Sequence, residues 1–162
     1  MTTPVATVAG KPIPLSVLEE RLALLRLGPR ARHIPSQGSP GYADACRWVA
    51  RELVTEAILE HEARARGLTE LSQLVLAVTE GVVVPDAEIR SYYDRNADLY
   101  HQAGGTISYE VAEASIHPEL LLAARVRAFD LWLEGRRQAL AIVEPGYEHP
   151  ADPSFRFPSH RH

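Results

Sequence analysis

The stretch VATVAGKPIPLSVLEERL, residues 5–22, contains the signals that decide the fold. Its first part alternates β-branched and small residues up to Gly10, which predicts a short strand followed by a tight reversal. Leucines then recur at spacings of three and four, as on one face of an amphipathic helix, at Leu15, Leu18, Leu22 and Leu25. We therefore expect a strand over about 4–9 and a helix over about 15–27, which ends at Gly28.

The rest of the chain reads mainly as helix. Apolar periodicity, capping residues and breakers predict four further helices, at about 42–66, 69–79, 86–95 and 108–138. One last strand is predicted at about 140–144. Gly67 should end the helix at about 42–66 as a left-handed cap, and Asp86 should cap the start of the helix at about 86–95. Periodicity directs Trp48 towards a core and predicts a buried stripe on the last helix at Leu121, Ala124, Ala128, Leu131 and Trp132.

The two strand signals lie at opposite ends of this helical region. We expect residues 5–8 to pair with residues 141–143, which would close the ends of the region on each other. The predicted fold class is therefore mainly α, with a small two-stranded β element that joins the N- and C-terminal segments.

Composition limits the classes of function. The chain has 162 residues, 46% of them hydrophobic and 23% charged, which suits one domain with a real core. A formal net charge of -4 and a pI near 6.0 give no general attraction for nucleic acid or for an anionic membrane. The N-terminal residues resemble no secretion signal, so we expect a cytoplasmic protein. The single cysteine, Cys46, lies in a helical pattern and is expected to be a buried structural thiol.

The order of these elements resembles SurA-type chaperones and parvulin-type peptidyl-prolyl isomerases. Residues 5–22 resemble the strand, glycine turn and capped helix that open the family's chaperone domain, and EHEARARGL, residues 60–68, resembles the end of its second core helix. VPDAEIRSYYDRNADLY, residues 84–100, resembles an extended link, an acidic helix with paired aromatic residues and an Asn-x-x-x-aromatic turn. Residues 107–144 resemble the helix and strand that follow the parvulin domain, which is itself missing here.

The resemblance implies a SurA N-terminal-like chaperone domain over residues 1–144. It says nothing about the tail over 145–162, which composition alone marks as rich in proline and histidine. It does not imply isomerase activity, because the domain that would perform that reaction has no counterpart. The chaperone domains of this family hold extended, apolar client segments. The candidate peptide-binding residues are the aromatic side chains of the helical region, Tyr92, Tyr93, Tyr100, Trp48 and Trp132. For the three tyrosines we expect packing of the scaffold to be the main role, with a place in an apolar groove as the alternative.

No catalytic motif is recognisable. The sequence lacks a P-loop, GxSxG, HExxH and CxxC, so an enzyme is not favoured, although the question stays open. Glu52, Glu56 and Glu60 form a row spaced by four, which is typical of a solvated helix face paired with arginines such as Arg51, Arg64 or Arg66.

The tail offers an alternative chemistry. His149, His160 and His162 fall near Asp152, and imidazole with carboxylate suits a divalent transition metal such as zinc, nickel, copper or iron. The same tail carries aromatic residues that are able to pack onto the body or onto a second subunit of a homodimer. Two interpretations therefore follow: a chaperone or accessory protein for a dedicated cytoplasmic client, or a small metal-binding protein or metalloenzyme.

Overall fold

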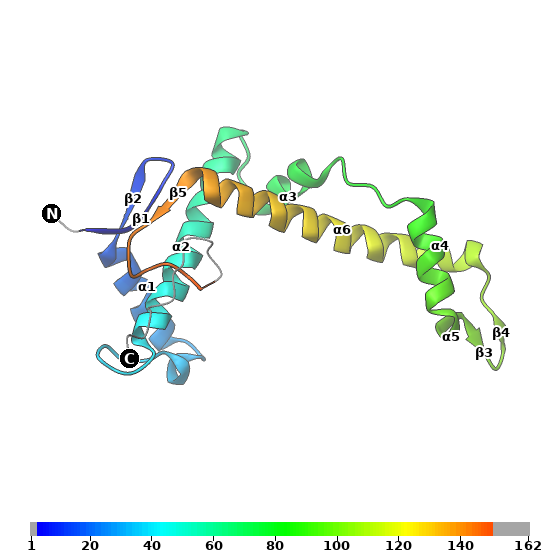
Figure 1. Ribbon diagram of the computed structural model, residues 1–162, viewed down its shortest axis with the longest axis horizontal. Coiled ribbons are helices and arrows are strands. Elements are labelled where there is room, and N and C mark those ends of the chain that lie inside the picture. The colour runs from blue at the N-terminus through cyan, green and yellow to red at the C-terminus, as the bar shows by residue number, and fades with distance from the viewer. Residues whose placement is uncertain (1–2, 151–162) are drawn as a thin grey trace, which may run out of the picture. The chain divides into compact units, whose positions relative to one another are not determined.

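The computed structural model describes residues 3–150, and the chain divides there into two compact units (Figure 1). Unit 1 consists of residues 3–71 together with 135–150, and unit 2 consists of residues 72–134. The fold is predominantly helical with a small antiparallel sheet, so the predicted fold class is confirmed. Whereas the sequence was interpreted as one SurA-like domain over 1–144, these residues form parts of both units.

The sheet of unit 1 contains the predicted pairing. Strand β1 (Pro4–Val8) pairs antiparallel with β5 (Ala141–Val143), and Thr7 lies opposite Ile142. On its other side β1 pairs with β2 (Lys11–Pro14), which gives the strand order β2-β1-β5. The predicted element therefore has three strands in place of two.

The third strand was missed because its two prolines argue against a strand. Ala9 and Gly10 have positive φ angles of 48° and 78°. Backbone of this kind forms the two-residue turn of a β-hairpin, so the chain reverses at once and β2 runs back along β1. Because β2 is an edge strand, its prolines are tolerated there.

Two helices of unit 1 supply most of its core. Helix α1 (Leu15–Leu27) packs against α2 (Tyr42–Ala65), and a 3₁₀ turn, η1 (Ala31–His33), lies in the loop between them (Figure 1). The core cluster shared by the helices and β1 contains Val5, Leu18, Leu22, Cys46, Val49, Ala50 and Leu53. Cys46 is buried as expected, and burial raises the pKa of its thiol more than Tyr42 and Arg26 lower it. Tyr147, which follows β5, also packs against this cluster.

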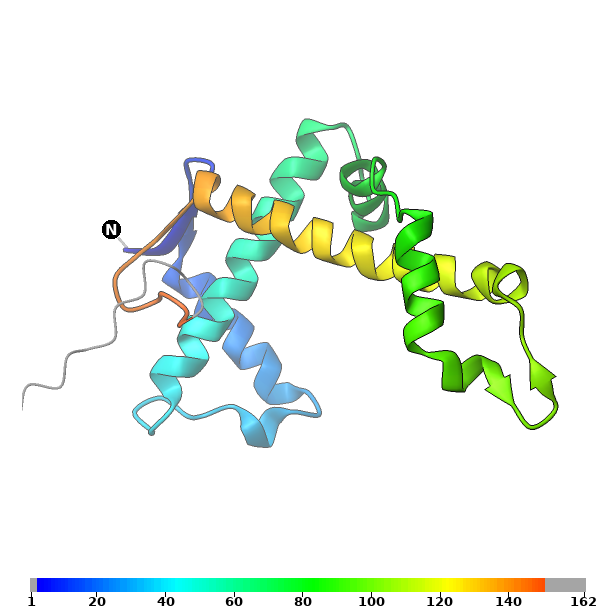
Figure 2. The same ribbon diagram turned by 45° about the vertical axis from the view of Figure 1, so that its right-hand side comes forward.

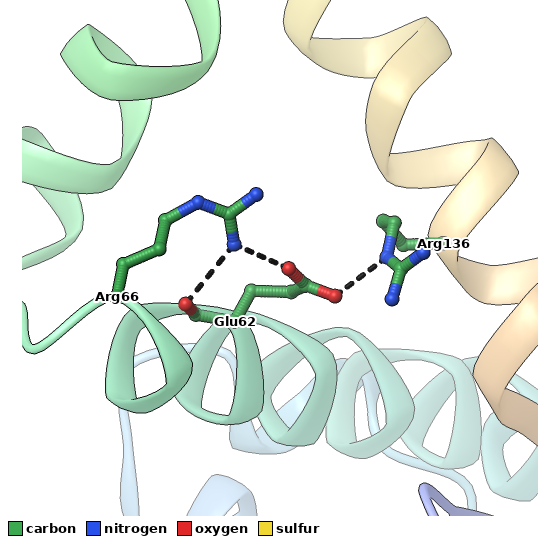
Figure 3. Close-up of polar contacts among 3 residues, drawn as sticks. All are labelled: Glu62, Arg66 and Arg136. Carbon is green, nitrogen blue, oxygen red and sulfur yellow. Dashed lines mark hydrogen bonds and ion pairs between the residues drawn. The ribbon is translucent and has the colours of Figure 1, made fainter.

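A buried carboxylate links α2 to the end of the long helix α6 (Tyr109–Leu140) (Figure 3). One oxygen of Glu62 accepts a hydrogen bond from Arg66, and the other accepts one from Arg136 Nε at 2.5 Å. Burial alone would raise the pKa of Glu62, but the hydrogen bonds and charges of the two arginines outweigh it and lower that pKa below its ordinary value of 4.5. Nearby, Arg137 donates to the hydroxyl of Thr55 at 2.8 Å. These contacts hold the last turns of α6 on α2, next to the point where β5 enters the sheet.

Unit 2 is built around the first part of α6. It contains α3 (Leu71–Thr79), apart from its first residue, then α4 (Asp86–Arg95), α5 (Ala97–Tyr100) and a small hairpin of β3 (His101–Gln102) and β4 (Gly105–Thr106) (Figure 2). Its buried cluster consists of Ile89, Tyr109, Ala112 and Ile116. Pro118 lies inside α6, which continues through it to Leu140.

Three local expectations were wrong. Leu131 is 76% exposed, because α6 carries apolar residues on more than one face and only those that meet a neighbouring element are covered. Trp48 is 46% exposed rather than turned into the core, which is formed instead by the adjacent α2 residues Cys46 and Val49. Asp86 is the first residue of α4 and not its cap, since Pro85 occupies the cap position, and the Asp86 carboxylate accepts a hydrogen bond from the hydroxyl of Tyr109.

Across residues 3–150 no helix combines the length and the apolar character that crossing a bilayer requires.

Candidate functional site

A groove around Trp48 is the candidate binding site of unit 1. We call it the Trp48 groove, and it is lined by His33, Ile34, Pro35, Gly41, Asp44, Ala45, Arg47, Trp48, His149 and Pro150. Its volume is about 490 Å³, within the range of about 300–1,000 Å³ that is usual for ligand pockets. The groove therefore has room for a few residues of an extended chain.

Local structure explains why the Trp48 groove is open. Gly41, at φ 86°, turns the chain into the first turn of α2, and the residues of α2 that follow divide between the core face and the groove. Cys46 and Val49 face the core, while Trp48 lies about 100° further round the helix from Val49 and keeps 46% of its surface exposed. The loop after α1 supplies the opposite wall through Ile34, which is held against the core.

The lining of the Trp48 groove is apolar with a polar rim. Ile34, Pro35 and Pro150 contribute aliphatic surface to the lining that they share with Trp48. On the rim, Arg47 Nη1 donates to Asp44 Oδ1 at 3.0 Å, so these two charges are already paired on the helix surface. A half-exposed tryptophan among aliphatic side chains offers a large rigid contact area and an N–H donor, which suits an apolar polypeptide segment.

The predicted tyrosines lie together in unit 2, as part of its packing. The rings of Tyr93 and Tyr100 stack with centroids 4.9 Å apart, and Tyr93 meets Tyr109 edge to face at 5.6 Å. Tyr93 also donates its hydroxyl to the carbonyl of Ile107 at 2.6 Å. Tyr92 packs against the same buried cluster. These contacts are those of scaffold aromatics, and a direct role in binding peptide stays a prediction.

Tyr109 was not singled out from the sequence, yet it is the centre of this cluster. Its hydroxyl donates to Asp86 Oδ1 at 2.6 Å, and Arg90 Cζ lies 4.0 Å from the centroid of its ring. The hydrogen bond to Asp86, with burial and the carboxylate charge, raises the pKa of Tyr109 to about 12. The only signal in the sequence was its position at the start of the last helix, which any capped helix shares.

Trp132 lies elsewhere in unit 2. It contacts Phe129 on the same helix, with ring centroids 5.3 Å apart. Along α6 it is separated from Tyr109 by 23 residues, a rise of about 35 Å at 1.5 Å per residue. Within unit 2 Trp132 therefore lies apart from the three tyrosines, and Trp48 is the predicted aromatic residue that lines a groove in unit 1.

The predicted metal ligands are only partly described. Within residues 3–150, no group of three or more His, Cys, Asp or Glu side chains is arranged to hold a metal ion. His149 lines the Trp48 groove together with His33 and Asp44. Asp152, His160 and His162 lie outside the described residues, so the proposed metal site in the tail stays a prediction.

The row of glutamates on α2 divides between different partners. Glu60 pairs with Arg64 at 2.5 Å, as expected for a solvated face. Glu56 instead accepts two hydrogen bonds from Arg21 on α1, from Nη1 at 2.7 Å and from Nη2 at 2.8 Å. This ion pair was not predicted, because the two residues are 35 positions apart in the sequence. This hydrogen-bonded pair lowers the pKa of Glu56, against the effect of burial. The row therefore serves helix packing and solvation in the structure.

Comparison with known proteins gives one partial match. Residues 4–40 match the model of a family of unknown function, DUF7158. The match covers β1, β2, α1 and almost all of the loop that leads to α2. No curated protein and no solved structure matches the chain.

Proposed function

We propose that this protein is a SurA-like chaperone or peptide-binding accessory protein without an isomerase domain. In this proposal it binds extended apolar segments of a dedicated client protein in the cytoplasm. The observation that carries the proposal is the Trp48 groove, in which a 46% exposed tryptophan shares the lining with aliphatic side chains.

The energetics of the groove favour such a ligand. Burying the exposed part of an indole removes apolar area from water, at about 25 cal/mol per Å², and costs little rotamer entropy. Tryptophan is also among the residues that most often dominate binding energy in interfaces. Because Asp44 and Arg47 already pair with each other at the rim, an apolar ligand leaves neither charge without a partner.

The order of elements provides the second support. A strand, a glycine turn and a leucine-patterned helix at residues 5–22 resemble the opening of SurA-type chaperone domains, and the chain there forms most of β1, β2 and most of α1. The resemblance favours an extended client segment as the ligand, and the exposed indole and aliphatic lining of the Trp48 groove support that choice.

Suppression of aggregation tests the proposal. The intact protein at a near-stoichiometric ratio, without ATP, should slow light scattering by a thermally unfolding client. Trp48→Ala should lose most of this effect, while Leu131→Ala should retain it. Leu131 is a matched control because it is an even more exposed apolar side chain, at 76%, outside the Trp48 groove. Equal suppression by both variants would contradict the assignment to the groove, and no suppression by the unaltered protein for any client would contradict the function.

A further inference from the structure

Unit 1 contains a second groove, between the β1–β2 hairpin and α2, with a volume of about 400 Å³. We call it the Lys11 groove. Its apolar floor includes Val8 and Ile13 from the hairpin and Ala57 from α2. Trp48 and the other residues of the Trp48 groove are not among those that line it.

The polar side of the Lys11 groove is basic. Arg64 and Glu60 both line it, and they neutralise each other through an ion pair of 2.5 Å. What remains is the ammonium group of Lys11, the only lysine in the sequence, and the imidazole of His61. Lysine supplies a cation with three donors, and histidine supplies a ring N–H donor. An apolar floor beside such donors is complementary to a carboxylate that carries an aliphatic group.

The adjacent strand edge limits how a polypeptide could enter. Val8 and Lys11 close the two-residue turn, so they form a hydrogen-bonded pair and the next position, Pro12, belongs to a pair without ladder bonds. An N–H at that position would point away from β1, to the free edge of β2, but proline has none. Pro14 ends the strand and also lacks an N–H. Addition of a client strand along β2 is therefore disfavoured, and recognition of a chain end is favoured.

We propose that the Lys11 groove binds the C-terminal carboxylate of a polypeptide whose last residue is aliphatic. The carboxylate accepts hydrogen bonds from Lys11 and His61, and the last side chain lies against Ile13 and Ala57. A groove of about 400 Å³ is near the lower end of the usual range for ligand pockets and suits one or two residues. The inference rests on the proposed function, because the polypeptide is a client, but it concerns a different site and a different part of the client.

The test compares two forms of one ligand. The probe is a fluorescein-labelled hexapeptide that ends in two leucines, prepared with a free carboxylate and with a C-terminal amide, and polarisation gives both affinities. The intact protein should bind the acid about fivefold more tightly than the amide, as expected for one exposed ion pair. Lys11→Gln should reduce this ratio to near one, Lys11→Arg should preserve it, and Leu131→Ala, at an exposed apolar residue outside both grooves, should leave it unchanged.

A second measurement uses the unaltered protein, so it does not depend on a variant folding. Lys11 is the only lysine, so acylation followed by peptide mapping reports on a single ε-amino group. The acid peptide should protect Lys11 from acylation, and the amide should not. Equal affinity for acid and amide, or equal protection by both, would overturn this inference and leave the proposed function standing. Failure of the protein to bind either peptide would also overturn this inference, and the aggregation assay would then decide the proposed function separately.

Discussion

Replacing Glu62 by Gln should destabilise unit 1 far more than the same change at Glu60. Both residues lie on α2, and each pairs with the arginine four residues further on. They differ in burial, since the side chain of Glu62 is 6% exposed and that of Glu60 is 68% exposed. Glu62 also binds Arg136 of α6. Comparison of the two substitutions therefore isolates the effect of burying a shared carboxylate.

The magnitude follows from the partners. Removing one member of a buried ion pair costs about 3–5 kcal/mol. Arg66 and Arg136 each keep 36% of their side chains exposed, so water partly solvates the guanidinium groups left behind. We therefore expect roughly half of that cost, about 2 kcal/mol, for Glu62→Gln. For Glu60→Gln we expect less than about 0.5 kcal/mol, as for surface pairs.

Urea unfolding followed by tryptophan fluorescence is the assay. The two tryptophans lie in different units, Trp48 in unit 1 and Trp132 in unit 2, so a Trp132→Phe background makes the emission report on unit 1. Glu62→Gln and Glu60→Gln variants in that background should differ by about 1.5–2 kcal/mol in the free energy of unfolding. A difference below about 0.5 kcal/mol would refute the reasoning.

The dependence of stability on pH gives the same prediction a second readout. The pKa of Glu62 is lowered in the folded protein, so the folded state favours the ionised carboxylate. Its stabilisation is fully present above the pKa of the unfolded chain and is lost as the pH falls through the lower, folded pKa. The gap between the unaltered protein and Glu62→Gln should therefore shrink as the pH falls below about 4.5. A gap that does not change with pH would contradict an ionic role.

Three further predictions concern other parts of the chain. The phenol of Tyr109 should titrate near pH 12. Asp86→Asn should lower that pKa towards 10, because the negatively charged acceptor of the phenol's hydrogen bond is lost, and ultraviolet difference titration measures both values. Ile116→Ala should cost about 2–5 kcal/mol because it opens a cavity in a fully covered site, whereas Leu131→Ala should be nearly neutral; urea unfolding followed by circular dichroism compares them. If the tail holds a structural metal, a chelator should lower the melting temperature of the intact protein and leave that of a chain truncated after Pro150 unchanged; equal responses would exclude this role.

Local patterns predicted most of the elements because each has a strong short-range signal. The leucine spacing after Gly10 and the left-handed Gly67, at φ 68°, correspond to a helix start and a helix end in the structure. The pairing of residues 5–8 with 141–143 was also predictable, because two short apolar strands at opposite ends of a helical region need a common partner. The third strand was not, because the prolines of β2 mask a hairpin that depends on the turn at Ala9 and Gly10.

The candidate sites were harder to predict because they depend on which face of a helix meets a neighbour. Trp48 follows the same periodicity as Val49, yet one lines a groove and the other is buried. Glu62, unlike the exposed Glu60, is buried and binds Arg136, which is 74 residues away. Periodicity shows that a helix is amphipathic, but long-range packing decides which part of its apolar or charged surface is covered.

The central claim is that the Trp48 groove binds extended apolar polypeptide, and the emission of Trp48 itself tests it most directly. In a Trp132→Phe background, titration with a reduced and alkylated, permanently unfolded protein should shift the emission of Trp48 to shorter wavelength in a saturable way, because the half-exposed indole becomes covered. A matched titration with the same protein in its native, folded state should leave the emission unchanged. Emission that does not respond to the unfolded protein, under conditions in which a sizing column shows the complex, would place the binding site elsewhere; the absence of any complex would contradict the account as a whole.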